Sequence, residues 1–303
     1  MGIEELRDMF KEPLPAWERV QEIRVRIGRP VLFRTDDGEL ELKISADRRL
    51  LRELLGILSK HSLYAFEDEV RQGFLTIEGG HRVGIAGKTV LYEAGEGPLG
   101  AIKTIRDISA LNIRLSHEKK GCADVLLPYL YNRNGEVEST LLISPPGAGK
   151  TTMLRDLIRR ISDGTDYGPG LGVSVVDERS ELGACFQGVP QCDLGRRTDI
   201  LDACPKAAGM LMMLRSMAPG ALAVDEIGTA ADLEAMRYVA NCGCALLATV
   251  HGAAIKDLEK KPVFAELMED RIFSRYVVLK KKPHPGSVAG IYDAERKEVR
   301  SVL

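Results

Sequence analysis

Residues 144–152 read Ser-Pro-Pro-Gly-Ala-Gly-Lys-Thr-Thr, between the apolar run 141–143 and the helical pattern that starts at Met153. A strand, a glycine-containing loop and a helix start in this order are typical of a phosphate-binding P-loop. The pattern G-x-x-x-x-G-K-[ST] begins here with serine, which needs only ordinary backbone angles at that place. The sequence therefore predicts a nucleotide site formed by Ser144, Pro145, Pro146, Gly147, Ala148, Gly149, Lys150, Thr151 and Thr152.

The groups of this loop have separate expected tasks. Backbone N–H groups of the loop and of the helix N-terminus converge on an anion, and Gly147 and Gly149 let the backbone approach phosphate closely. We expect the Lys150 ammonium to lie at the β- and γ-phosphates and the Thr151 hydroxyl to ligate Mg²⁺. The predicted ligands are thus ATP and Mg²⁺.

A second apolar run, Ala221-Leu-Ala-Val, ends in the carboxylates Asp225 and Glu226. A strand that ends in two acids is common by itself, but this one lies 75 residues (225 − 150) after Lys150 in the same predicted sheet. That is the Walker B position of a P-loop enzyme. We expect Asp225 to hold Mg²⁺ through its water shell, and Glu226 to orient or deprotonate the attacking water.

The next strand, Leu246-Leu-Ala-Thr-Val-His, places Thr249 and His251 near its carboxyl end. Ligands of doubly wound sheets bind at the carboxyl ends of strands, so these two residues are expected to face the same crevice as the P-loop. They could hydrogen-bond the γ-phosphate or the attacking water. A purely structural histidine at the strand end is the alternative.

A third strand followed by acids is Val173-Ser-Val-Val-Asp177-Glu-Arg-Ser-Glu181. Three carboxylate groups that converge near phosphate need Mg²⁺ or an arginine to balance their charge. We expect Glu181 to be the second candidate for the catalytic carboxylate, with an ion pair across the crevice as its alternative role. Arg215 is one candidate for the counter-charge.

The order of these patterns predicts the fold class. From about residue 122, strands and helices alternate, which is typical of a parallel sheet. Before that point the chain has short β-like runs and glycine-rich turns. We therefore predict an α/β protein with a P-loop domain over 121–303 and a smaller N-terminal α+β domain over 1–120. The expected strands of the P-loop domain are 139–144, 172–177, 221–225, 244–250 and 275–280, and the expected helices are 150–162, 203–217 and 231–241.

Composition excludes several classes of protein. Hydrophobic residues make up 45% and charged residues 28% of the chain, and the net charge of −2 gives no global basic field that would attract nucleic acid. The six cysteines form no CxxC pair, so reduced thiols in a cytosolic compartment are expected. No run approaches the ~18 apolar residues that a membrane span needs, so any membrane role is expected to be peripheral.

The motifs together resemble a known group of proteins. The order of P-loop, acidic box at 177–182, Walker B strand and Thr249-Val-His251 is similar to the secretion ATPase superfamily of RecA-like P-loop enzymes. More closely, the chain resembles the stage III sporulation protein AA family of endospore-forming bacteria. That resemblance also rests on the N-terminal runs 22–26, 62–65, 73–84 and 111–114.

The resemblance implies more than the residues alone. It implies a RecA-like core and an ATPase of the channel between mother cell and forespore, located in the mother-cell cytoplasm. It also implies a homo-hexamer docked on a small membrane protein. In secretion ATPases, arginines of the N-terminal domain reach the nucleotide, and Arg106 and Arg114 occupy matching strand positions. The four-cysteine zinc motif of those families is absent from this sequence, so no zinc is expected.

Two other functions remain open at this level. One is a P-loop protein that binds nucleic acid, because a chloroplast and plant family resembles this core joined to a nucleic-acid-binding domain. The other is a scaffold that binds ATP and barely hydrolyses it. The paired carboxylates favour an enzyme over the scaffold, and the charge balance does not favour the nucleic-acid protein.

Overall fold

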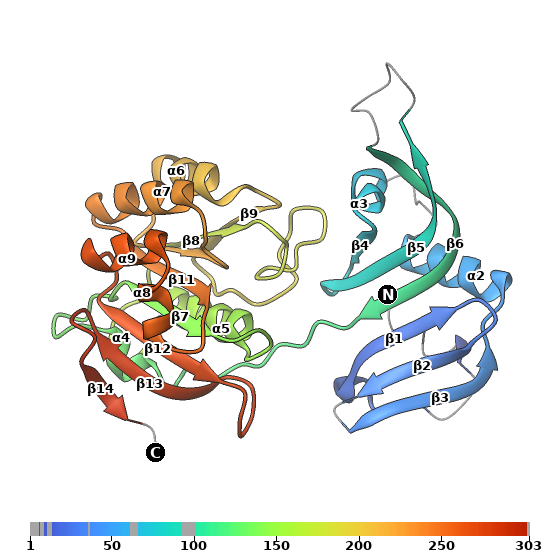
Figure 1. Cartoon of the computed structure of the whole chain (residues 1–303), viewed down its shortest axis with the longest axis horizontal. Helices are drawn as coiled ribbons and strands as arrows, with labels where there is room; N and C mark the ends of the chain where they lie inside the picture. The colour runs from blue at the N-terminus through green and yellow to red at the C-terminus, as the bar shows by residue number, and fades with distance from the viewer. Residues whose placement is uncertain are drawn as a thin grey trace. The chain divides into compact units, whose positions relative to one another are not determined.

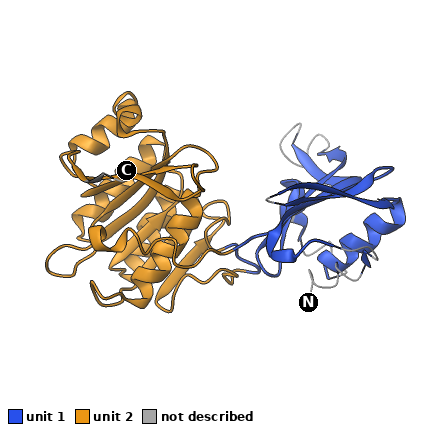
Figure 2. Cartoon of the chain, turned by 90° about the horizontal axis from the view of Figure 1, so that it is seen from below, with its two compact units in different colours: residues 1–117, 184–187 blue, residues 118–183, 188–303 orange. Residues whose placement is uncertain are grey.

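The computed structural model describes residues 6, 9–10, 14–35, 37–60, 66–92 and 101–301. The chain divides into two compact units, which Figure 2 shows in different colours. Unit 1 contains Met1–His117 together with the short segment Ala184–Gln187, and unit 2 contains Glu118–Gly183 and Gly188–Leu303. The run 62–65, which carries part of the family resemblance, lies outside the described residues.

Unit 1 is built on a six-stranded antiparallel sheet in the order β3-β2-β1-β6-β5-β4. In β1, Ile23 and Val25 are buried while Arg24 between them is only partly buried, as expected for a sheet with one covered face. Asp47 caps α2 (Arg48–Leu58) by accepting a hydrogen bond from Leu50 N at 2.7 Å. The elements are β1 (Val20–Arg26), β2 (Pro30–Thr35), β3 (Gly38–Ser45), α2 (Arg48–Leu58), α3 (Glu67–Arg71), β4 (Phe74–Ile77), β5 (His81–Leu91) and β6 (Ile102–Arg114).

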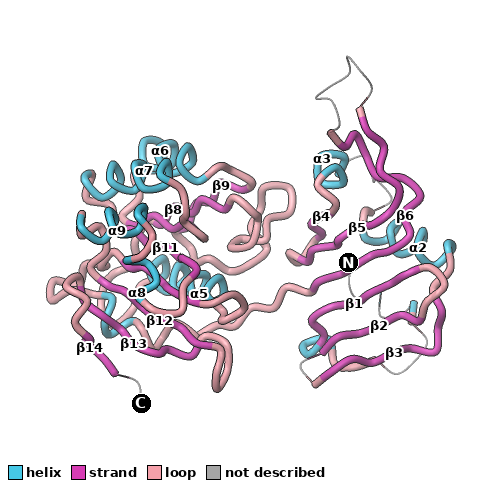
Figure 3. The backbone as a smooth tube through the Cα atoms, in the orientation of Figure 1, coloured by secondary structure: helices cyan, strands magenta, loops and turns pink. Residues whose placement is uncertain are grey.

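Unit 2 contains an eight-stranded sheet in the order β14-β13-β12-β7-β11-β10-β8-β9 (Figure 3). The six strands from β12 to β9 in that order run parallel, and β13 and β14 close one edge as antiparallel strands. The parallel sheet with its intervening helices confirms the predicted α/β fold class. The strands are β7 (Thr140–Ser144), β8 (Val173–Asp177), β9 (Thr198–Asp202), β10 (Ala221–Val224), β11 (Ala245–His251), β12 (Arg275–Lys280), β13 (Ser287–Asp293) and β14 (Glu298–Ser301).

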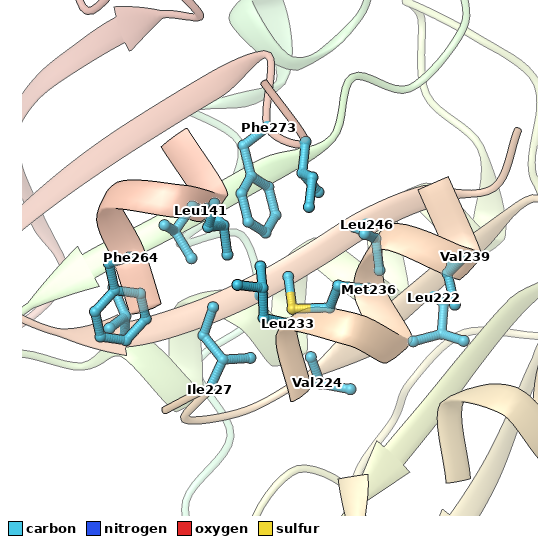
Figure 4. Close-up of a cluster of buried hydrophobic side chains, with 14 of the residues drawn as sticks. Leu141, Leu222, Val224, Ile227, Leu233, Met236, Val239, Leu246, Phe264 and Phe273 are labelled. Atoms are coloured by element: carbon cyan, nitrogen blue, oxygen red, sulfur yellow. The ribbon is translucent and has the colours of Figure 1, made fainter. Parts of the chain in front are cut away.

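Helices cover both faces of this sheet (Figure 1), so its central strands are almost continuously apolar. One face packs against α6, α7, α8 and α9. Figure 4 shows Leu233, Met236 and Val239 of α7 in that cluster with Leu222 and Val224 of β10. The opposite face packs against α4 and α5. The helices are α4 (Leu127–Leu130), α5 (Lys150–Asp163), α6 (Lys206–Met217), α7 (Ala230–Asn241), α8 (Ile255–Glu259) and α9 (Pro262–Glu269).

The parallel arrangement fixes where a ligand can bind. All six parallel strands point their carboxyl ends to the same edge of the sheet. At that edge β11 lies between β7, which leads into the P-loop, and β10, which leads into Asp225 and Glu226. No helix in the described part of the chain is long and apolar enough to cross a membrane.

Candidate nucleotide-binding site

The P-loop joins the end of β7 directly to the start of α5. Gly147 and Gly149 have φ angles of 70° and 84°, a left-handed conformation that favours glycine. A side chain at Gly149 would also be crowded, because an added Cβ would lie 3.0 Å from Gly286 N. The backbone at the N-terminus of this 14-residue helix is therefore shaped to hold an anion.

Ser144, in place of the first glycine of the pattern, is the last residue of β7 and is fully buried. Its carbonyl accepts a hydrogen bond from Gly252 N at 3.1 Å, which ties the start of the P-loop to the residue after β11. A strand residue needs no positive φ, so the departure from the pattern leaves the loop geometry intact.

Lys150 and Glu226 meet at the centre of the site. The Lys150 ammonium donates to Glu226 Oε1, and His251 Nε2 lies 2.9 Å from the same oxygen. Lys150 Nζ and His251 Nε2 are 3.4 Å apart. These residues come from α5, from the end of β11 and from the residues after β10, so the sheet brings together groups that are up to 101 positions apart in the chain.

A second set of contacts joins Thr151, Asp225 and Thr249. The Thr151 hydroxyl donates to Asp225 Oδ2 at 2.8 Å, and the buried Thr249 hydroxyl donates to Asp225 Oδ1. Thr249 Oγ1 also accepts from Glu226 N at 2.9 Å. Glu226 has a φ of 55°, which costs a non-glycine residue about 1–2 kcal/mol. Thr249 thus positions both carboxylate residues after β10.

Arg179 also contacts Glu226, although nothing in the sequence pattern marks it as a residue of the site. Its Nη1 lies 2.7 Å from Glu226 Oε2, and its side chain remains 63% exposed. Burial alone would raise the pKa of Glu226, but the hydrogen bond from Lys150 and nearby positive charges hold that pKa below its usual value. Lys150 and Arg179 therefore both place positive charge at Glu226, and the predicted counter-charge role of Arg215 stays a prediction.

The acidic loop after β8 is held in place by Asp177. Its carboxylate accepts hydrogen bonds from the backbone N–H groups of Glu181, Leu182 and Gly183 at 2.8–2.9 Å. Burial raises the pKa of Asp177, and these three bonds oppose that shift. Arg155 of α5 donates to the carbonyls of Glu181 and Leu182, so the loop is fixed to the P-loop helix.

Glu181 and the two acids after β10 line one small hollow. Its lining consists of Asp177, Glu178, Arg179, Glu181, Lys206, Asp225 and Glu226. Glu181 is exposed, whereas the Glu226 side chain is only 21% exposed and is hydrogen-bonded to three side chains. The structure therefore brings both candidate bases to the same hollow, and Glu226 is the more buried of the two.

The other predicted arginines lie elsewhere. Arg215, on the last turn of α6, lines a separate groove between α6 and α7 with Leu211 and Tyr238. It is absent from the lining of the acidic hollow, which does not support its predicted role within one chain. Arg106 and Arg114 are exposed residues of β6 in unit 1, and their predicted contact with nucleotide stays a prediction.

The residues present fit a magnesium triphosphate. The loop is crowded at Gly149, where an added Cβ would lie 3.0 Å from Gly286 N, and a helix N-terminus follows it. Thr151 and Asp225 place a hydroxyl and a carboxylate 2.8 Å apart, and such oxygen groups are the ligands that Mg²⁺ prefers. Lys150 adds a cation next to them.

Solved structures with the same fold are P-loop ATPases. The ATPase DotB of Legionella pneumophila matches with a TM-score of 0.59 at 14% identity, covering 91% of this chain and 77% of that one. The pilus retraction motor PilT with bound ADP matches with a TM-score of 0.58 at 15% identity, covering 92% and 78%. The fold is therefore the RecA-like P-loop fold of these ATPases, as predicted.

The sequence comparison is more specific. The chain belongs to the family described as sporulation stage III, protein AA, whose model matches residues 3–299. Stage III sporulation protein AA of Bacillus subtilis (strain 168) is 40% identical over 293 residues, which covers 96% of this chain and 93% of the relative. The uncharacterized protein ycf45 of Porphyra purpurea is 32% identical over 133 residues, or 43% of this chain and 23% of the relative. The family resemblance found in the motifs is confirmed.

Proposed function

We propose that the chain is a Mg²⁺-dependent ATPase. The observation that carries this proposal is the convergence of Lys150 and Thr151 from the P-loop with Asp225 and Glu226 from the neighbouring strand end. A phosphate cradle beside a paired carboxylate is the minimum that hydrolysis of a triphosphate needs, because one group binds the anion and the other activates water. The folds of DotB and PilT support the same reaction class.

The contacts of Glu226 suggest how its carboxylate becomes available as a general base. Lys150 and Arg179 donate to the two carboxylate oxygens of Glu226, which would have to receive a proton from water. A γ-phosphate would compete with Glu226 for the Lys150 ammonium, and this competition would leave the carboxylate available to water. Bound Mg²⁺ would neutralise charge on the phosphates, and Thr151 and Asp225 would hold it.

We further propose that turnover powers the channel between mother cell and forespore during sporulation. In this model the chain acts in the mother-cell cytoplasm as a homo-hexamer and reaches the membrane only through a small membrane protein. Family membership supports the link to sporulation, and the likeness to a pilus retraction motor supports a mechanical output. Nucleic acid is not expected to be the partner, since the net charge is −2.

The test is the steady-state ATPase rate against protein concentration for the wild type and Lys150→Ala. Lys260→Ala is a matched control, because the Lys260 side chain is 78% exposed and its Nζ lies 4.0 Å from its ion-pair partner, Asp257 Oδ1. We expect a rate per subunit that rises with concentration, disappears in Lys150→Ala and is unchanged in Lys260→Ala.

Other results would redirect the proposal. A Lys150-dependent rate that does not change with concentration would contradict the assembling motor but keep the ATPase. ATP binding without turnover, even after the cytosolic segment of the membrane partner is added, would favour the nucleotide-gated scaffold. Binding of single-stranded nucleic acid that weakens steeply with salt would favour the nucleic-acid alternative.

A further inference from the structure

The two carboxylate oxygens of Glu226 have different partners. Oε1 accepts a hydrogen bond from Lys150 and lies 2.9 Å from His251 Nε2, so both of its acceptor positions are taken. Within the described part of the chain, the side-chain partner of Oε2 is Arg179 alone, whose Nη1 lies 2.7 Å away. Lys150 is the partner that a γ-phosphate would attract. Departure of Lys150 would therefore open a position on Oε1 and leave Oε2 as it is.

The loop that carries Arg179 is anchored on both sides of this residue. Before it, Glu178 forms an ion pair with Lys206 of α6. After it, the Ser180 hydroxyl donates to Asp202 Oδ1 at 2.6 Å. Because the backbone is already held, keeping the guanidinium at its carboxylate partner costs only the ordering of one side chain. This distinguishes the contact from an ion pair between two mobile surface groups, which contributes little.

Glu226 is also held at its backbone. Its N–H donates to Thr249 Oγ1 at 2.9 Å, and its side chain is only 21% exposed. A carboxylate that is fixed at its backbone and at one oxygen has a defined direction for the other oxygen. That direction matters for a general base, which must come within about 2.6–3.2 Å of the group whose proton it takes.

We propose that Arg179 is the positioning residue of the general base, holding Oε2 of Glu226 so that Oε1 faces the attacking water. This inference rests on the proposed ATPase. The water gives its proton to Oε1, and its oxygen forms a bond to the γ-phosphorus. The bond from that phosphorus to the bridging oxygen breaks, and its electron pair leaves with ADP. Arg179 keeps its protons throughout and acts only through Glu226.

A double-mutant cycle with single-turnover hydrolysis and ATP titration tests this role. We expect Arg179→Ala to slow hydrolysis about tenfold, because a misdirected carboxylate loses reach to water. ATP affinity should change by less than about twofold, since Arg179 does not act on the phosphates. In the Glu226→Gln background, Arg179→Ala should change the rate by less than about twofold, because the group that it positions is already lost.

Two further variants separate this role from a structural one. Arg179→Lys should recover part of the rate, because lysine keeps the charge but not the planar fork. Arg196→Ala is the matched control, since the Arg196 side chain is 71% exposed and pairs with Asp163 at 3.2 Å. It should change neither the rate nor ATP affinity.

Each other result has a distinct meaning. An equal loss of rate in both backgrounds would overturn the inference, because Arg179 would then act independently of Glu226. A matching loss of ATP affinity would overturn it as well, since it would indicate direct contact with nucleotide, and so would an unchanged rate in Arg179→Ala. If Glu226→Gln keeps the wild-type rate, the ATPase proposal stands and this inference fails. If the wild type has no Lys150-dependent turnover, both fail.

Discussion

The two ends of the unit 2 sheet differ in size and in chemistry. At the amino ends of the strands there is a hollow of about 940 Å³, whose lining includes Ser139, Leu171, Gly220, Ala245 and Ser274. At the carboxyl ends, the acidic hollow around Glu226 is much smaller. By size alone, the amino-end hollow would be taken as the binding site.

The chemical groups around the two hollows favour the carboxyl-end hollow as the binding site instead. At the amino ends, Arg237 is already paired with Asp270 at 2.5 Å and with Glu266, as in ordinary surface ion pairs. At the carboxyl ends, a glycine loop, a helix N-terminus and two strand-end acids converge. In a parallel sheet the direction of the strands locates the ligand, because the helix N-termini with their free N–H groups follow the carboxyl ends of the strands.

The largest expected effect is a loss of turnover, and it should differ between the two acids Glu226 and Glu181 at the carboxyl ends of the strands. Glu226→Gln should bind ATP and lose about a hundredfold or more in turnover, because a general base contributes roughly 10²–10⁴-fold. Glu181→Gln should lose much less, since Glu181 is exposed whereas Glu226 is partly buried and accepts a hydrogen bond from Lys150. Single-turnover hydrolysis beside a binding titration measures both properties. A severe loss in Glu181→Gln with a mild one in Glu226→Gln would exchange the two roles.

An intermediate effect on nucleotide affinity is expected when one glycine from each end of the unit 2 sheet is replaced by alanine. Gly149 and Gly243 both have positive φ, at 84° and 77°, so alanine should cost each about 1–2 kcal/mol of stability. A Cβ on Gly243 meets nothing within 4 Å, whereas one on Gly149 meets Gly286 N at 3.0 Å. Only Gly149→Ala should therefore lose nucleotide binding, by about tenfold or more.

Urea unfolding and a nucleotide titration of the two glycine variants provide the check. If Gly243→Ala also lost nucleotide affinity, the amino-end hollow, which Gly243 lines, would gain support as a nucleotide site.

The smallest expected effect is at Cys242, an exposed thiol whose neighbours Asn241 and Gly243 line the amino-end hollow. Alkylation of Cys242 with iodoacetamide at pH 8 should proceed at the same rate with and without Mg²⁺-ADP. Burial raises the pKa of Cys244 and of Cys122 to about 12, so both should react far more slowly. Mass spectrometry resolves the sites, and protection of Cys242 by ADP would contradict the assignment of the nucleotide to the opposite end.

Much of the site could be predicted because its signals are local. The P-loop, Asp225, Thr249 and His251 each follow an apolar strand, and a parallel sheet must bring such strand ends to one edge. The same reasoning predicts both ends of β7, β8, β10, β11 and β12 to within about one residue.

What could not be predicted depends on which strands are neighbours. The position of Gly286 beside Gly149 follows from β12 lying beside β7, which the order of elements along the chain does not reveal. Arg179 is one exposed residue in a polar loop, and only the contact of that loop with Glu226 distinguishes it. Arg215 is six residues before β10, and its helix ends near the amino ends of the strands, away from the acids.

The segment Ala184–Gln187 has a consequence for how the protein is made. Phe186 stacks on Phe66 with ring centroids 6.3 Å apart, and Lys60 lies 5.3 Å from the centre of the Phe186 ring. These contacts belong to unit 1, although the segment follows β8 in the chain. During synthesis from the N-terminus, unit 1 cannot be complete until the ribosome has passed residue 187, by which time the P-loop has already been made. A fragment that stops at His117 would lack part of its own compact unit and leave Phe66, now 8% exposed, without its aromatic cover.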